Sequence, residues 1–78
     1  MNKKLIKLVK QDHVQQLLAF GMSRNKKPYY TLKDSLANPD PAVVAEIPEV
    51  FGYTWQEVKD AVIAHCDIDK EFHPTPLF

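Results

Sequence analysis

The sequence predicts an all-α protein, a compact single domain of four to five short helices. Apolar residues recur at helical spacings of three and four positions, and capping residues and prolines stand where short helices would begin and end. A length of 78 residues, 45% hydrophobic and 26% charged, is typical of one globular domain. We therefore expect one domain over residues 1–78, with residues 68–78 as an extended C-terminal tail that contains two prolines.

Two short elements are expected at the start of the chain, at 3–10 and 13–20. Their apolar residues centre on opposite sides of a continuous helix, so one straight helix cannot bury both sets. We expect Asp12 to cap the second helix in a capping box with Gln15, and Gly21 to end it. The first element fits a helix, and the sequence leaves a strand open.

Two further helices are expected in the middle of the chain. Thr31 can cap a short helix at 32–37. Asp40, followed by a proline, has the pattern of an N-cap and first residue for a helix at 41–47, which Pro48 is expected to end. Because this helix is apolar on nearly every side, we predict that it lies at the centre of the core.

The last helix is expected at 55–66. Thr54 and Glu57 have the spacing of a full capping box. Its apolar stripe has spacings of three and four and comprises Trp55, Val58, Val62 and Cys66. Together with the helix at 41–47, it should form the centre of the domain. The sequence leaves open whether the tail after it packs on the core or binds a partner.

Charge is divided between the two halves of the chain, although the formal net charge is zero. Residues 1–33 hold eight basic residues and one acidic residue, a formal charge of +7, and residues 34–78 hold two basic and nine acidic residues, a formal charge of −7. Such a division points to an electrostatic partner. It is equally compatible with two halves that fold against each other and neutralise one another.

The positive charge concentrates in the first element and in the loop at 24–27. A basic loop followed by two tyrosines is typical of a surface that contacts phosphates and stacks on bases, and an acidic protein surface would suit it as well. The pI of 6.8 is lower than that of dedicated nucleic-acid binders, and the tyrosines fit core positions equally well. The expected partner-binding residues are Lys7, Lys10, Arg24, Lys26, Lys27, Tyr29 and Tyr30.

Metal-binding residue types are present without the spacing of a metal site. A structural zinc site needs paired ligands, but Cys66 is the single cysteine, and neighbouring His65 points about 100° away from it on a helix. A calcium loop starting at Asp67 would place Phe72 where an EF-hand requires glycine. We therefore expect no metal and no cofactor. The ligand types considered are Asp12, His13, His65, Cys66, Asp67, Asp69 and His73.

Catalytic patterns are also missing from the sequence. Cys66 with a histidine would be the candidate dyad, but a nucleophilic cysteine needs an electropositive setting that lowers the pKa of its thiol. Cys66 is instead expected on the apolar stripe near a helix C-terminus and before two aspartates, and each of these features raises that pKa. A chain with two glycines also lacks a phosphate-binding loop. We expect a protein that is not an enzyme.

The C-terminal half resembles a helix-turn-helix over about 24 residues: a helix at 42–47, a turn containing Gly52 and a helix at 55–65. The resemblance implies DNA binding by the second helix. Pro48 departs from the pattern, because that motif usually keeps a small residue there. The second helix also carries two acidic residues against one lysine, and phosphates would repel it.

These observations predict a small non-enzymatic binding or regulatory protein that occupies a surface of a macromolecular partner, in the manner of an accessory or phage-type inhibitor protein. The alternatives are a DNA-binding regulator and a metal or thiol site around Cys66. We expect a protein partner first, nucleic acid through the basic half second, and self-association as a homodimer as a further option. No signal-peptide pattern and no apolar run of about 20 residues is present, so the cytoplasm is the expected location and no membrane contact is expected.

Overall fold

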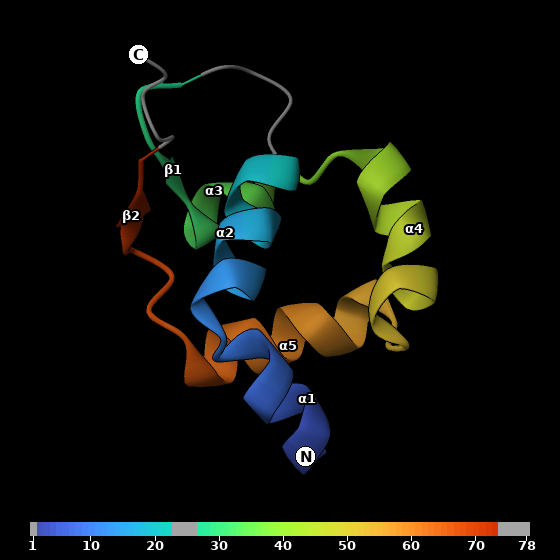
Figure 1. The fold of residues 1–78 in the computed structure, drawn as a ribbon. Coiled ribbons are helices and arrows are strands. Elements are labelled where there is room, and N and C mark those ends of the chain that lie inside the picture. Colours follow the sequence, from blue (N-terminus) through green and yellow to red (C-terminus); the bar gives the residue numbers. More distant parts are fainter. Residues whose placement is uncertain (1, 23–26, 74–78) are drawn as a thin grey trace.

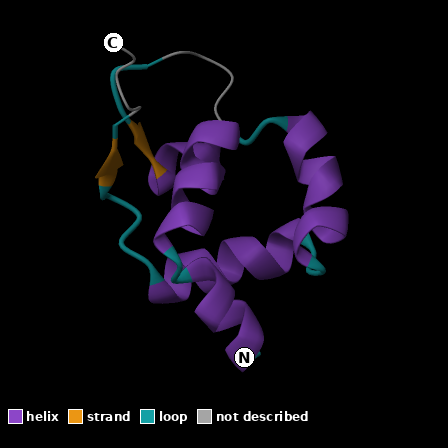
Figure 2. Cartoon of the chain, viewed as in Figure 1, coloured by secondary structure: helices purple, strands orange, loops and turns teal. Residues whose placement is uncertain are grey.

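Helices dominate the computed structural model, which describes residues 2–22 and 27–73 (Figure 1). Five helices and one two-stranded antiparallel sheet occur in the described residues (Figure 2). In chain order the elements are α1 (Lys3–Val9), α2 (Asp12–Gly21), β1 (Tyr30–Thr31), α3 (Leu32–Ala37), α4 (Pro41–Phe51), α5 (Trp55–His65) and β2 (Glu71–Phe72). The predicted all-α fold is confirmed, with a very small sheet added, and the first element is a helix.

The helices are arranged around α5, which runs across one end of the molecule (Figure 1). α1 packs against α5, and α2 packs against α1 at one end and against α3 along its length. The sheet lies beside α2 and α3. α4 stands on the other side of α2 and joins α5 through a three-residue turn. α2 and α4 therefore extend to the same side of α5, apart from each other.

The core draws buried residues from all five helices and β2, with α1 packed closely against α5. The predicted stripe on α5 is confirmed: Val58 and Val62 are buried, and Trp55 and Cys66 pack beside them half-buried. Ala61 joins the stripe and is fully buried. The other buried apolar residues are Leu5, Val9, Val14, Leu18, Ala19, Met22, Leu32, Ile47 and Phe72.

Three of the predicted helix starts are confirmed by their hydrogen bonds. At α5, Glu57 N donates to Thr54 Oγ1 over 3.1 Å while Thr54 N donates to Glu57 Oε1 over 3.0 Å, which is the full capping box. At α3, Thr31 Oγ1 accepts from the third residue of the helix over 3.2 Å. At α4, Asp40 Oδ1 accepts from Ala42 N over 3.0 Å.

The predicted start and end of the second helix are wrong. Gln11 is the N-cap, and its side chain makes no capping bond. Asp12 is the first helical residue, and Gln15 turns away from the helix start to donate to Val9 O over 3.0 Å, because a partner on the core is within its reach. Gly21 is still helical, and Met22, at the C-cap with a right-handed φ of −84°, ends the helix with a buried side chain.

The predicted end of the fourth helix at Pro48 is also wrong. α4 continues to Phe51 and ends at Gly52, whose φ of 77° lies in the left-handed region that glycine adopts without strain. A proline inside a helix lacks the N–H that would bond four residues back, here to Val44. The residues after Pro48 still bond normally, and Gly52 N donates to Pro48 O over 2.9 Å.

The predicted place of this helix at the centre of the core is wrong as well. Ile47 is its one buried residue, Val43 and Val44 are half-buried, and Ala42 and Ala45 are exposed. The physical reason is size: a chain this short has too few apolar residues to enclose a helix on all sides. α4 therefore packs with one side, and its other sides face solvent.

The segment after α5 returns to the core. Lys33 N donates to Ile68 O over 3.0 Å, and β2 then pairs with β1, with Phe72 opposite Tyr30. Phe72 is 5% exposed, and its ring meets that of Phe20 edge-on at 6.5 Å. The tail therefore packs on the core as far as β2. Residues 74–78, which are the rest of the predicted tail, lie outside the described residues.

Replacing Phe72 by alanine is expected to lower the free energy of unfolding by about 3–5 kcal/mol, because a buried ring is lost. Ile63→Ala is the matched control: Ile63 is 53% exposed on α5, and its loss should change that free energy by at most about 0.5 kcal/mol. Urea unfolding followed by circular dichroism measures both variants. Equal effects would show that β2 is not part of the folded core.

Candidate functional site

The residues expected to bind a partner do not gather on one surface in the described part of the chain. Lys7 and Lys10 belong to α1 and its C-cap, at the lower end of α2 in Figure 1. Lys27, Tyr29 and Tyr30 lie at or just before β1, toward the other end of α2. The remaining two, Arg24 and Lys26, lie outside the described residues.

The group near β1 is largely engaged within the protein. The ring of Tyr30 meets that of Phe20 edge-on at 5.1 Å, and its hydroxyl accepts from Lys27 N over 3.0 Å. Lys27 Nζ lies 3.8 Å from a carboxylate oxygen of Asp34. Tyr29 is 40% exposed, with its ring 5.8 Å from that of His73. Tyr30 therefore serves the core, whereas Tyr29 presents part of its ring to solvent.

The lysines of α1 form an exposed basic face. Lys3, Lys7 and Lys10 follow one another at helical spacings of four and three, so they share one side of α1, and Lys4 lies beside them. Among the described residues, no ion pair includes any of the four. We call Lys3, Lys4, Lys7 and Lys10 the lysine face.

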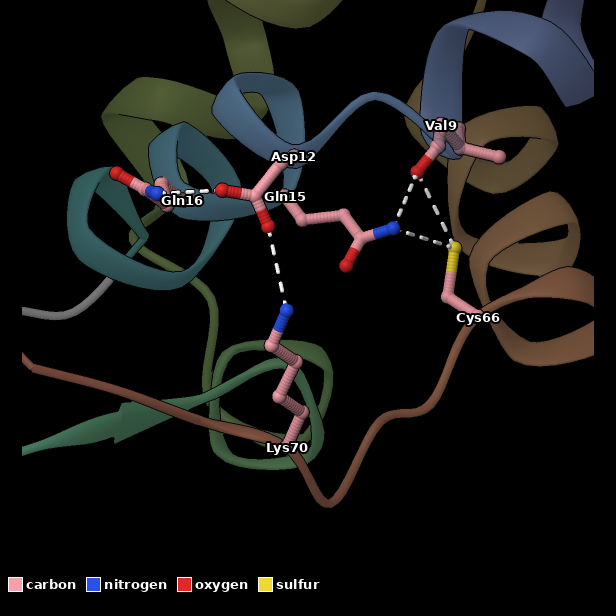
Figure 3. A network of polar contacts seen from close by, with 6 residues as sticks. All are labelled: Val9, Asp12, Gln15, Gln16, Cys66 and Lys70. Atoms are coloured by element: carbon pink, nitrogen blue, oxygen red, sulfur yellow. Dashed lines mark hydrogen bonds and ion pairs between the residues drawn. The ribbon is translucent and has the colours of Figure 1, made fainter.

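Cys66 lies in a polar junction of three helices (Figure 3). Its thiol donates to Val9 O over 3.2 Å, and Gln15 Nε2 donates to the same carbonyl over 3.0 Å and to Cys66 Sγ over 3.5 Å. Burial raises the pKa of the Cys66 thiol, and the positive charge of Lys10 lowers it by less. The direction agrees with the prediction, and of the three predicted causes burial on the apolar stripe is the one that acts. The junction connects α1, α2 and the end of α5.

A second polar contact ties the segment after α5 to the start of α2. Lys70 Nζ donates to Asp12 Oδ1 over 3.2 Å, and Gln16 Nε2 donates to Asp12 Oδ2 over 2.7 Å (Figure 3). These two hydrogen bonds, the one from Lys70 first, lower the pKa of the Asp12 carboxyl. Within residues 2–22 and 27–73, no three histidine, cysteine or acidic side chains come together as a metal site would need.

An apolar groove lies between α2 and α4, with a volume of about 160 Å³. Leu17 and Val50 on its walls are 58% and 66% exposed, which is unusual for large apolar side chains. The remaining lining residues are Leu18, Gly21, Met22, Val43, Glu46, Ile47 and Phe51. The groove is therefore an open hollow whose walls are almost wholly apolar.

The charged residues of the two helices that line the groove are acidic, apart from one histidine. α2 holds Asp12 and His13, α4 holds Glu46 and Glu49, and neither helix contains lysine or arginine. Asp12 is paired with Lys70. The two glutamates are exposed and take part in no ion pair within the described residues. The groove is thus apolar inside and negatively charged along α4.

Sequence reasoning missed this groove because it ended the fourth helix at Pro48 and buried it. The signal was present: Val43, Ile47 and Val50 are spaced by four and three. A helix that continues through Pro48 places these three residues on one side. Val50 then lies beyond the end of the shorter helix that the sequence predicted. The exposed apolar side of α4 follows from that single extension.

Comparison with known proteins gives no match for this chain: no family model, no curated protein and no solved structure is significantly similar to it. Within residues 2–22 and 27–73, no helix has the length and apolar character needed to span a bilayer.

Cys66 is expected to react with iodoacetamide several-fold more slowly in the folded protein than in urea at pH 8. The raised pKa leaves less of the reactive thiolate at that pH, and the junction covers the sulfur. The difference should narrow as the pH rises, because the folded thiol then ionises too. Mass spectrometry of the alkylated chain measures both rates, and a faster reaction in the folded state would contradict this reading of the junction.

Proposed function

We propose that this chain is a small non-enzymatic binding protein that receives an apolar side chain of a protein partner in the groove between α2 and α4. The observation that carries the proposal is the groove itself, with Leu17 and Val50 exposed on its two walls. Contiguous apolar surface of this kind is typical of interaction sites. By covering the segment of the partner that carries this side chain, the protein would regulate the partner without catalysing a reaction.

The groove has room for one large side chain. A dry cavity of roughly 150 Å³ lined by apolar side chains can hold a benzene ring, and the volume here is about 160 Å³. A leucine, methionine or phenylalanine of the partner would lie between Ile47 and Leu18, which form the inner part of the lining. Burial of the exposed parts of Leu17 and Val50 would add to the favourable free energy of binding.

Charge narrows the choice of partner. Glu46 lines the groove and Glu49 follows on the same helix, without a lysine or arginine on either wall. Basic residues beside the apolar anchor would meet these carboxylates, whereas acidic residues there would be repelled. The proposed ligand is therefore a protein segment with an apolar anchor flanked by lysine or arginine.

Selection of random peptides displayed on phage against the folded protein tests this ligand chemistry. The enriched peptides are expected to share one or two large apolar residues next to lysine or arginine. Enrichment of peptides with acidic flanks would contradict the proposal, because the groove would then not be the surface that selects them.

Three aspartate variants locate the binding surface. Leu17→Asp and Val50→Asp are expected to weaken binding of the selected peptides at least about tenfold, because each places a charge against the apolar anchor. Ile63→Asp is the matched control, an equally exposed apolar residue on α5 that does not line the groove. Circular dichroism checks that all three fold. Loss of binding in the control, or its retention in both groove variants, would place the site elsewhere.

A second proposal, DNA binding, is favoured by one observation, the order of α4, a three-residue turn and α5. Two features of α5 weigh against it. The helix carries Glu57 and Asp60 against one lysine, and its stripe of Val58, Ala61 and Val62 is turned into the core. Phosphates would meet mainly acidic side chains there.

DNA binding is tested by fluorescence anisotropy with a labelled duplex at low and at physiological salt. A DNA-binding regulator would bind at low salt and lose affinity steeply as salt rises. We expect no binding at either concentration, with peptide binding to the same sample as the control for its activity. Salt-sensitive duplex binding that Leu17→Asp leaves unchanged would favour the DNA proposal over the groove.

A further inference from the structure

We propose that the groove binds the lysine face of a second copy of this chain, with Ile6 as the apolar anchor. This inference rests on the proposed function of the groove and names an occupant for it. It combines two features that have no ion pair with other described residues of the same copy: the basic side of α1 and the apolar, acidic side of α4.

The side of α1 that carries the lysines has the chemistry that the groove selects. Ile6 is partly exposed and, unlike Leu5 and Leu8, does not pack against the core cluster. It lies three residues after Lys3 and four before Lys10, so both are its neighbours on the helix surface. Ile6 is thus an aliphatic side chain with two lysines beside it on one side.

Charge complementarity joins the two surfaces. Within the described residues, neither the lysine face nor Glu46 and Glu49 takes part in an ion pair of its own copy. Contact between copies would place several ammonium groups against these carboxylates around a desolvated anchor, where the electrostatic attraction is stronger than in open water. The opposite charges of the two halves of the chain, +7 and −7, act in the same direction.

The position of α1 makes this contact intermolecular. Leu5 and Val9 are 3% and 0% exposed and hold α1 against α5. Figure 1 places α1 below α5, whereas α2 and α4 extend above it, and no residue of α1 lines the groove. Ile6 of one copy therefore cannot reach the groove of the same copy. It can reach the groove of a second copy.

The same charges disfavour a contact of groove on groove. Such a pairing would bring Glu46 and Glu49 of both copies together, and like charges there repel. In the proposed contact each copy offers one lysine face and one groove. These contacts either close reciprocally between two copies or continue into rings or open chains.

Sedimentation velocity over rising protein concentration, at low and at high salt, tests the inference. We expect species larger than the 9.0 kDa monomer, with a dissociation constant that rises at least about tenfold between low and high salt because screening weakens exposed charge pairs. Val50→Asp should abolish the association, and Ile63→Asp should leave it unchanged.

Charge reversal gives the decisive comparison. K3E/K7E/K10E leaves Lys4 as the one positive charge on the lysine face and so makes both surfaces acidic, whereas E46K/E49K makes both basic. Each variant alone should therefore be monomeric. An equimolar mixture of the two should associate again, because each surface then meets its opposite, and Lys33→Glu serves as an exposed control that changes neither surface. Circular dichroism shows whether each variant folds.

The outcomes separate this inference from the proposed function. A wild-type protein that stays monomeric, while selected peptides still bind the groove in a Val50-dependent way, overturns the inference and leaves the function. Association that survives both charge reversals also overturns it. If Val50→Asp changes neither association nor peptide binding, both proposals fail.

Discussion

The packing of α1 across the buried stripe of α5 is the interaction on which the rest of the structure depends. Val9 is 0% exposed, and it meets a stripe whose members Val58 and Val62 are 1% and 0% exposed. The Val9 carbonyl also accepts hydrogen bonds from Gln15 and Cys66, so α2 is tied to the same point. A chain of 78 residues can bury only a limited apolar area, and the packing of α1 on α5 uses part of it.

The groove is a consequence of that limit. α1 and α2 supply five buried residues between them, whereas α4 contacts α5 but contributes Ile47 alone to the buried core. Asp40 and Gly52 still define where α4 begins and ends, so the helix forms fully although one side lacks a partner. The apolar groove and the exposed Val50 arise because α4 forms over its full length although the core covers only one side of it.

The structural features that the sequence predicted correctly are local ones. The caps at Thr31, Asp40 and Thr54 depend on hydrogen bonds to residues two or three positions away, so the sequence contains both partners at a fixed spacing. The wrong predictions concern features that depend on contacts with residues far away in the sequence. Gln15 has the spacing of a capping residue, but its amide bonds to Cys66, 51 positions along the chain. The groove was missed partly for a local reason, the end assigned to α4 at Pro48, and partly because its two walls come from helices that only the fold brings together.

The charge division shows how a feature of the sequence changes its meaning in three dimensions. Folding joins few charges of the two halves directly: of the two lysine–carboxylate pairs in residues 2–22 and 27–73, Lys27–Asp34 joins majority charges, and Lys70–Asp12 joins the minority charge of each half. The surplus lysines stay together on α1, and surplus carboxylates stay on α4, at different places on the surface. Charges that remain apart within one copy are available to another molecule, and the apolar hollow beside the carboxylates gives such a contact the desolvated anchor that ion pairs alone lack.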